Sequence, residues 1–265
     1  MTPTTPFAVS TLWRRVTRRK MPGLSLDQVR EVVARHGVHE WYVRAYGERA
    51  ERSESWRPCY WIHDHLPPSA RILETGCGIA TTTAWLGQYG FHNLWAFDID
   101  AKVVAAARDI IAAAGVRAVL WKDDGLGPRY QPVATWDAIL AINWLMLVEK
   151  LDLPRFVEEY AGRLNPGGAL FFDVIDASYN DNPLSQYLTS DWQKPVAQRR
   201  PSEYKHRFSR ADVERAAIGA GLVASQFPGT TQLVPRKTYV LRKPTREAAS
   251  PTREATPPKL TLARV

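Results

Sequence analysis

The sequence predicts an α/β protein built on a doubly wound, seven-stranded, mostly parallel sheet. Two observations lead to this class: short apolar runs alternate with helical segments from Ala70 onward, and a glycine turn at Gly76 and Gly78 follows the first run. Parallel strands need a crossover between them, usually a helix, so this alternation favours a parallel sheet. The turn then lies at the carboxyl end of a strand, where open α/β sheets bind ligands.

Residues 25–68 are expected to form a helical cap before the sheet. Ser25 is a suitable helix N-cap, and apolar residues recur behind it at helical spacing until Gly37. A second, aromatic-rich helical stretch covers residues 39–66 and ends at the proline pair 67–68.

The domain proper is expected at residues 69–243. Buried strands are predicted at 70–74, 93–99, 118–122, 136–142 and 169–175, and helices between them at 81–90, 101–115 and 153–164. A late helix at 208–222, with Ser209 and Asp212 spaced as a capping box, precedes two further strands at 222–227 and 237–243. The insertion, residues 176–208, is expected to act as a lid that encloses the acceptor together with the first helices.

The net charge of +8 is located at the two ends of the chain. Residues 1–26 carry +5 and residues 242–265 carry +4, which leaves −1 for residues 27–241. We therefore expect disordered basic tails at 1–24 and 244–265 and a body that is not built to bind nucleic acid. The basic amphipathic segment at 11–20 either contacts anionic lipid weakly or is solvated.

The cysteine content and the apolar runs indicate a cytoplasmic protein without a transmembrane segment. Cys59 and Cys77 are too few for a disulfide framework, and no apolar run approaches the length of a membrane span. The start of the chain lacks the apolar core of a secretory signal, although its Arg-rich character also overlaps with organelle transit peptides. Nothing in the sequence predicts an oligomeric state.

Acidic residues follow three predicted strands: Glu74, Asp98 and the pair Asp123-Asp124. A dinucleotide site would require a third glycine where Ala80 and Thr81 stand, and Glu74 would repel its phosphates. The acids instead favour a cationic ligand that carries a ribose.

These motifs resemble those of the class I S-adenosylmethionine-dependent methyltransferases, over about residues 70–243. The family's first motif, an acid followed by alternating glycines, corresponds to Glu74-Thr75-Gly76-Cys77-Gly78, and a further match lies in the Asn-Pro-Gly-Gly turn at 163–168. The resemblance implies that the first motif approaches the methionine part of the cofactor. It further implies that Asp98, beside Ile99, holds the ribose hydroxyls and that Asp123, or alternatively Asp124, binds the adenine amino group.

Asn143-Trp144-Leu145-Met146 occupies the place where methylases of exocyclic base amines carry an Asn/Asp-Pro-Pro-aromatic turn. Both prolines are missing, so the sequence favours methylation of an O or N atom of a small molecule, with Asn143 lining the pocket. The alternatives are an RNA or protein methyltransferase tethered through the basic tails and a catalytically silent binding subunit.

His206 is the best candidate for a general base, because histidine titrates near neutral pH and this one precedes the late helix at the expected site; a solvated histidine is the alternative. The His63-Asp64-His65 stretch lacks a third ligand, so no metal is predicted. A basic cluster within residues 194–210 suggests an anionic acceptor or, equally, a solvated lid.

Overall fold

The computed structural model describes residues 24–47, 49–228 and 233–245 of the 265-residue chain. Its strands are β1 (Arg71–Thr75), β2 (Asn93–Asp98), β3 (Val119–Lys122), β4 (Trp136–Ala141), β5 (Leu164–Asp176), β6 (Arg207–Phe208), β7 (Val223–Gln226) and β8 (Arg236–Arg242). Its α-helices are α2 (Leu26–His36), α3 (Trp41–Gly47), α4 (Arg49–His65), α5 (Thr81–Gln88), α6 (Ala101–Ala113), α7 (Leu153–Gly162) and α8 (Arg210–Gly219). The expected tails lie almost wholly outside the described residues.

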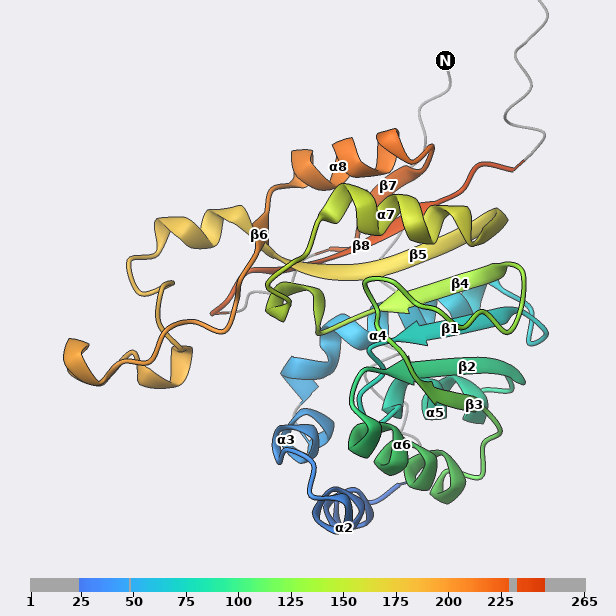
Figure 1. Ribbon diagram of the computed structural model, residues 1–265, viewed down its shortest axis with the longest axis horizontal. Helices are drawn as coiled ribbons and strands as arrows, with labels where there is room; N and C mark the ends of the chain where they lie inside the picture. The colour runs from blue at the N-terminus through green and yellow to red at the C-terminus, as the bar shows by residue number, and fades with distance from the viewer. Residues whose placement is uncertain (1–23, 48, 229–232, 246–265) are drawn as a thin grey trace, which may run out of the picture.

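The strands form one sheet in the order β3-β2-β1-β4-β5-β8-β7 (Figure 1). The strands β1 to β5 pair in parallel, and β8 runs antiparallel between β5 and β7. The predicted doubly wound, mostly parallel sheet is therefore confirmed. Sequence reasoning missed β6, a strand of 2 residues that pairs in parallel with the end of β5.

The strand order reverses at β1. Strands β2 and β3 lie on one side of β1, whereas β4 and β5 lie on the other. Glu74 near the end of β1 pairs with Ala96 of β2 and with Leu140 of β4. The carboxyl ends of these strands therefore meet at a topological switch point, the usual ligand position in open α/β sheets.

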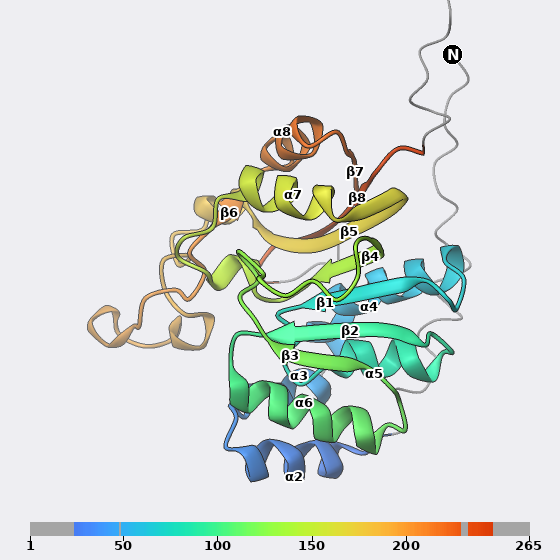
Figure 2. The ribbon, with the colours of Figure 1, turned by 45° about the vertical axis from the view of Figure 1, so that its right-hand side comes forward.

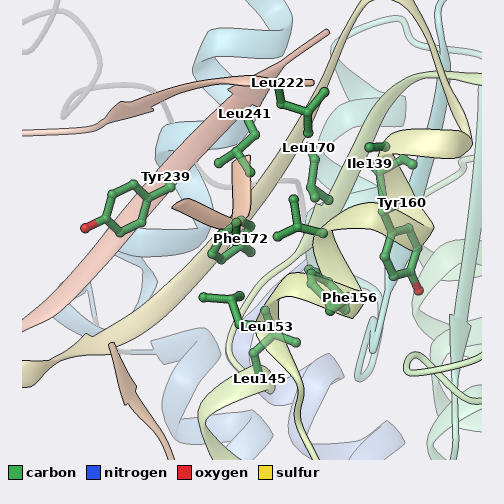
Figure 3. Packing of buried hydrophobic residues seen from close by; sticks show 14 of the residues in the cluster. Ile139, Leu145, Leu153, Phe156, Tyr160, Leu170, Phe172, Leu222, Tyr239 and Leu241 are labelled. Atoms are coloured by element: carbon green, nitrogen blue, oxygen red, sulfur yellow. The ribbon is translucent and has the colours of Figure 1, made fainter. Parts of the chain in front are cut away.

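Helices cover both faces of the sheet. Helices α7 and α8 bury Phe156 and Val213 against the face that carries Phe172 of β5, and this cluster forms the largest part of the core (Figure 3). Helices α4 and α5 bury Ile62 and Trp85 on the opposite face. Helix α2 packs on the outside of α6, as Figure 2 shows.

The described part of the N-terminal segment, from residue 24 to the start of β1, contains the helices α2, α3 and α4. Ser25 caps α2 in a capping box with Gln28, and Gly37 ends the helix in the left-handed conformation with φ of 60°. Helix α4 belongs to the sheet layer, because Cys59 and Ile62 are fully buried against it. Of the three helices described before β1, α2 and α3 lie outside the layer that covers the sheet.

The Asn-Pro-Gly-Gly motif forms a bulge inside β5, which corrects the expectation of a turn before the strand. Trp136 of β4 pairs with Leu164, but Ala138 pairs with Ala169, so the residues between the two β5 positions leave the ladder. A Cβ atom on Gly168 would lie 3.0 Å from the Trp136 carbonyl oxygen, which explains glycine there.

The insertion projects from the sheet edge at which β1 and β4 end (Figures 1 and 2). At its base, Tyr179 packs with Met146, Ile175 and Val234, and partly buried Trp192 and Tyr204 contact this cluster. Farther out, Tyr187 pairs with Pro201 and closes a hairpin-like arm. Among the described residues, no helix combines the length and the apolar character that a membrane crossing requires.

Candidate active site

The glycine turn between β1 and α5 is held in a left-handed backbone path. Gly76, Gly78 and Ala80 have φ of 59°, 54° and 56°. Glycine reaches this region without strain, whereas Ala80 adopts it as a non-glycine residue. The Cys77 amide donates to the Phe97 carbonyl oxygen at 2.9 Å, which ties the turn to β2.

Glu74 meets the first turn of α5. Its carboxylate accepts from the backbone amide of Thr83 at 3.0 Å and from the Thr83 hydroxyl. Ala80, the N-cap residue of α5, has no side-chain acceptor, so Glu74 supplies one from β1. Burial raises the pKa of Glu74 to about 7, although the bonds from Thr83 and Thr82 oppose the shift.

Asp98 lies across the turn from Glu74. One carboxylate oxygen accepts from the Gly78 amide at 2.9 Å, and the other accepts from the Asp100 amide at 3.1 Å. Ile99, the next residue, is 63% exposed and offers an apolar surface beside this carboxylate. The predicted ribose acid is therefore positioned by the glycine turn itself.

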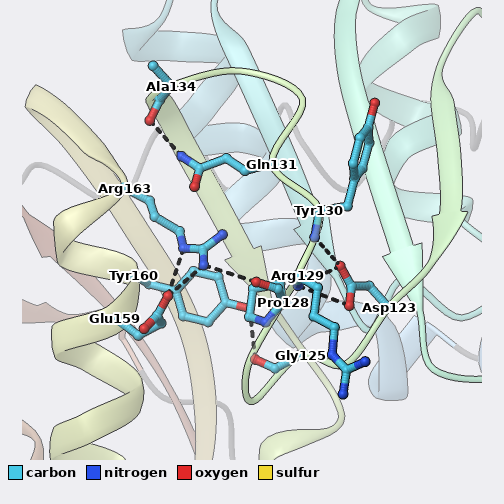
Figure 4. A network of polar contacts seen from close by, with 10 residues as sticks. All are labelled: Asp123, Gly125, Pro128, Arg129, Tyr130, Gln131, Ala134, Glu159, Tyr160 and Arg163. Atoms are coloured by element: carbon cyan, nitrogen blue, oxygen red, sulfur yellow. Dashed lines mark hydrogen bonds and ion pairs between the residues drawn. The ribbon is translucent and has the colours of Figure 1, made fainter.

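Asp123 organises the loop after β3 (Figure 4). Its carboxylate accepts from the amides of Asp124, Arg129 and Tyr130 and from the Trp121 indole. Burial acts to raise the pKa of Asp123, but the hydrogen bonds from this loop outweigh it and lower the pKa. Asp124 is exposed and accepts from the Leu126 amide, so it has more capacity for a ligand.

Trp144, to which the sequence assigned no role, lies between two glycine-containing loops. A Cβ atom on Gly76 would lie 2.5 Å from Trp144 Cδ1, and one on Gly125 would lie 2.6 Å from Trp144 Cη2. The indole Nε1 is buried and has no hydrogen-bond partner among the described residues. The indole ring therefore requires glycine at both positions, and the left-handed backbone requires it at Gly76 as well.

Asn143 is fixed by a buried ion pair that sequence reasoning missed. It adopts φ of 71°, and its amide donates to Asp173 Oδ1 at 2.7 Å. Arg236 of β8 contacts both the Asp173 carboxylate and the Asn143 side-chain oxygen. The sequence does contain an indication of this ion pair, because Asp173 is an acid inside an apolar strand and a buried charge requires a partner.

His206 lies beside the loop after β4. Its Nε2 is 3.1 Å from the Glu149 carbonyl oxygen, which can only accept, and its ring stacks on Phe208. The adjacent Lys205 amide donates to the Met146 carbonyl oxygen at 2.8 Å. These contacts attach the end of the insertion to the loop that carries Asn143.

Two members of the basic cluster at 194–210, Lys194 and Arg200, have a common partner within the insertion. Arg200 forms two side-chain hydrogen bonds to Asp191, at 2.8 and 3.0 Å, and Lys194 lies 2.6 Å from the same carboxylate. The Arg200 guanidinium, followed by Lys194, holds the pKa of Asp191 well below its usual range. Arg199 donates to the Lys194 carbonyl oxygen and lies over the Tyr187 ring.

The metal prediction concerns His63 and His65 on α4. His63 Nδ1 lies 2.8 Å from Asp64, and His65 Nδ1 lies 2.8 Å from the Trp61 carbonyl oxygen. Among the residues that the structure describes, no group of three or more His, Cys, Asp or Glu side chains is placed to hold a metal ion.

The carboxyl ends of β1, β2 and β3 therefore combine a left-handed glycine turn, the Asp98 carboxylate with an exposed apolar neighbour, and the acidic loop at 123–124. This arrangement fits a nucleoside attached to an uncharged or cationic chain, because the glycines expose backbone and the acids can accept hydroxyl and amino protons. It is the arrangement of a nucleoside-cofactor site on a doubly wound sheet.

Comparisons with known proteins identify the domain. Residues 72–168 match the family model of the methyltransferase domain. The ribosomal RNA small subunit methyltransferase C of Chromohalobacter salexigens is 34% identical over 107 residues, which cover 39% of this chain and 31% of that protein. The 2-methyl-6-phytyl-1,4-hydroquinone methyltransferase of Synechocystis is 27% identical over 176 residues, which cover 65% and 52%.

Solved structures agree in fold. The magnesium protoporphyrin IX methyltransferase of Synechocystis, solved with S-adenosylhomocysteine, matches with a TM-score of 0.58 and 13% identity over 87% of this chain and 99% of that one. An S-adenosylmethionine-dependent methyltransferase of Clostridium acetobutylicum matches with a TM-score of 0.56 and 14% identity over 77% and 96%. The chain therefore matches a methyltransferase domain over residues 72–168 and has the fold of the S-adenosylmethionine-dependent methyltransferases. It spans about a third and about half of the two sequence relatives.

Proposed function

We propose that the protein transfers the methyl group of S-adenosylmethionine to an O or N atom of a small-molecule acceptor. The observation that carries this proposal is the position of the glycine turn and Asp98 at the switch point, with the aromatic base of the insertion at the same sheet edge. In this proposal Asp98 binds the ribose hydroxyls and Ile99 packs on the adenine. Asp124, rather than Asp123, accepts from the adenine amino group.

The bound cofactor would supply a methyl group on a positively charged sulfur. The residues of the chain would align the acceptor atom with that methyl group and would take up the proton that the acceptor loses. Methyl transfer by in-line displacement depends chiefly on alignment. The ion pair between Asp173 and Arg236 supports this alignment, because it fixes the backbone of Asn143 beside the turn.

The acceptor class is supported by the base of the insertion. Tyr179 is 2% exposed and packs against Met146 and Ile175 in a hydrophobic cluster. Its hydroxyl has no hydrogen-bond partner among the described residues. A buried hydroxyl without a partner is costly unless a ligand satisfies it. A sequence relative is named for a hydroquinone and a structural neighbour for a protoporphyrin, and both are small molecules.

His206 is the proposed base for the proton that the acceptor loses. Donation from Nε2–H to the Glu149 carbonyl oxygen leaves Nδ1 as the acceptor nitrogen of the neutral ring. In this role Nδ1 must reach the bound acceptor. Because a general base acts in the transition state, His206→Gln should lower kcat more than it raises the KM for the acceptor.

Incubation of the purified protein with methyl-labelled S-adenosylmethionine and a cellular metabolite extract tests the proposal. We expect a labelled small molecule to appear together with S-adenosylhomocysteine, and we expect Asp98→Ala to lower the yield of both at a cofactor concentration near the wild-type Kd. If the wild-type protein binds the cofactor but labels no small molecule, the acceptor class is wrong.

RNA methylation is the second candidate, because a ribosomal RNA methyltransferase is 34% identical over 107 residues. Addition of total RNA to the same labelling experiment separates the two functions. Label in RNA that disappears in roughly 0.3 M salt would indicate binding through phosphate contacts, since counterion release makes such binding steeply salt-dependent.

A further inference from the structure

We propose that Tyr42 of α3, which lies outside the matched residues 72–168, forms the outer wall of the cofactor site and donates a hydrogen bond to the cofactor. This inference rests on the proposed function, because it concerns the same site. It assigns a cofactor-binding role to a helix that the sequence placed on the acceptor side.

The Tyr42 ring lies directly on the second glycine of the turn. A Cβ atom on Gly78 would lie 2.7 Å from Tyr42 Cε1, 3.5 Å from Cδ1 and 3.6 Å from Cζ. Such a short distance means that an alanine at this position would clash with the ring. Gly78 is also the residue whose amide donates to Asp98, so the ring lies beside the proposed ribose acid.

The surroundings of the Tyr42 hydroxyl make it a donor. Burial raises the pKa of Tyr42, and the negative charges of Asp98 and Asp100 raise it further. The phenol therefore remains protonated throughout the working pH range. A protonated hydroxyl can donate to a ribose or carboxylate oxygen that a ligand brings to this edge of the sheet.

Helix α3 holds Tyr42 in place through the neighbouring turn. Tyr46 is 5% exposed, and its hydroxyl donates to the Leu24 carbonyl oxygen at 2.7 Å. Residues i and i+4 lie on the same face of a helix, so this anchor fixes the face that carries Tyr42. Trp41 supports the ring from its edge, with 5.3 Å between ring centroids and an angle of 72°.

Calorimetric titration with S-adenosylhomocysteine tests the assignment in the full-length protein. We expect Tyr42→Ala to raise the Kd at least tenfold, because it removes both the wall and the donor. Tyr42→Phe should raise it about two- to tenfold, as for the loss of one neutral hydrogen bond. The matched control is Tyr89→Ala, since Tyr89 stacks on Trp85 at the opposite end of α5 and should leave the Kd unchanged.

The outcomes separate the inference from the proposed function. No binding by the wild-type protein would refute the proposed function and this inference with it. Wild-type binding that Tyr42→Ala leaves unchanged, or tightens, would refute the inference alone, since tighter binding means that the ring obstructs the site. If Tyr42→Ala does not fold, Tyr42→Phe and Tyr42→Leu decide: the inference requires weaker binding in both, with the larger loss in Tyr42→Leu.

Discussion

Replacement of Glu74 by glutamine should change how the stability of the protein depends on pH. Glu74 is 6% exposed, and burial raises its pKa from the ordinary value of 4.5 to about 7. The carboxyl group is therefore protonated in the folded protein at pH values where it is ionised in the unfolded chain. A glutamine side chain at this position cannot ionise, so the variant should not show this linkage.

The sign and the size of this pH dependence follow from the raised pKa of Glu74. Because the folded-state pKa is raised, the stabilising contribution is fully present below pH 4.5 and is lost as the pH rises through about 7. Each pH unit over which only the folded state holds the proton corresponds to about 1.4 kcal/mol. Between about pH 5 and pH 8, the wild-type protein should thus lose about 2 to 3 kcal/mol of unfolding free energy relative to Glu74→Gln.

Urea unfolding followed by tryptophan fluorescence at several pH values across this range measures the difference. The control is Glu158→Gln, because Glu158 is an exposed carboxylate on α7 and should show no such trend. A constant difference between the wild-type protein and Glu74→Gln across the range would refute the reasoning. It would show that the bonds from Thr83 compensate fully for burial.

Three further predictions concern the cofactor site and the insertion. Asp98→Ala should weaken S-adenosylhomocysteine binding by roughly 2–3 kcal/mol in calorimetry, because charge-assisted hydrogen bonds are lost; unchanged affinity in a folded variant would remove the proposed ribose contact. Gly76→Val should cost about 1–3 kcal/mol of unfolding free energy, since φ is 59° and Trp144 occupies the Cβ position, and should abolish binding; retained affinity would place the ligand elsewhere. Arg200→Gln should increase chymotrypsin cleavage within the insertion and leave cofactor affinity unchanged, because the buried Asp191 loses its main partner; unchanged cleavage together with a raised acceptor KM would return Arg200 to an acceptor-binding role.

The elements that the sequence predicted correctly depend on local signals. The predicted capping box of Ser209 and Asp212 is present at the start of α8, and Ser25 and Gly37 delimit α2 as expected. The spacing of apolar residues and the capping residues are local features of the sequence, so they can be recognised without knowledge of the fold. The same alternation predicted the parallel pairing of β1 to β5, because parallel strands need a crossover helix.

The features that the sequence did not reveal depend on contacts between distant segments. Arg236 and Asp173 are 63 positions apart, and only the antiparallel pairing of β8 with β5 brings them together. The Tyr42 ring and Gly78 meet because α3 folds back over the turn. Asp191 lies three residues before Lys194 and so outside the basic cluster at 194–210. Both Lys194 and Arg200 nevertheless contact its carboxylate.

The acids at the strand ends first satisfy donors of the chain itself, and their remaining capacity separates structural from ligand-facing roles. A carboxylate has about four lone-pair positions. Asp123 accepts from three amides of its own loop and from the Trp121 indole of β3, so it has little capacity left for a ligand. Asp98 accepts from two backbone amides and is only partly buried. Glu74 is buried against Thr83 and couples the end of β1 to α5. Three acids that look equivalent in the sequence thus divide by the donors around them, and Asp98 is the one best able to accept from a ribose.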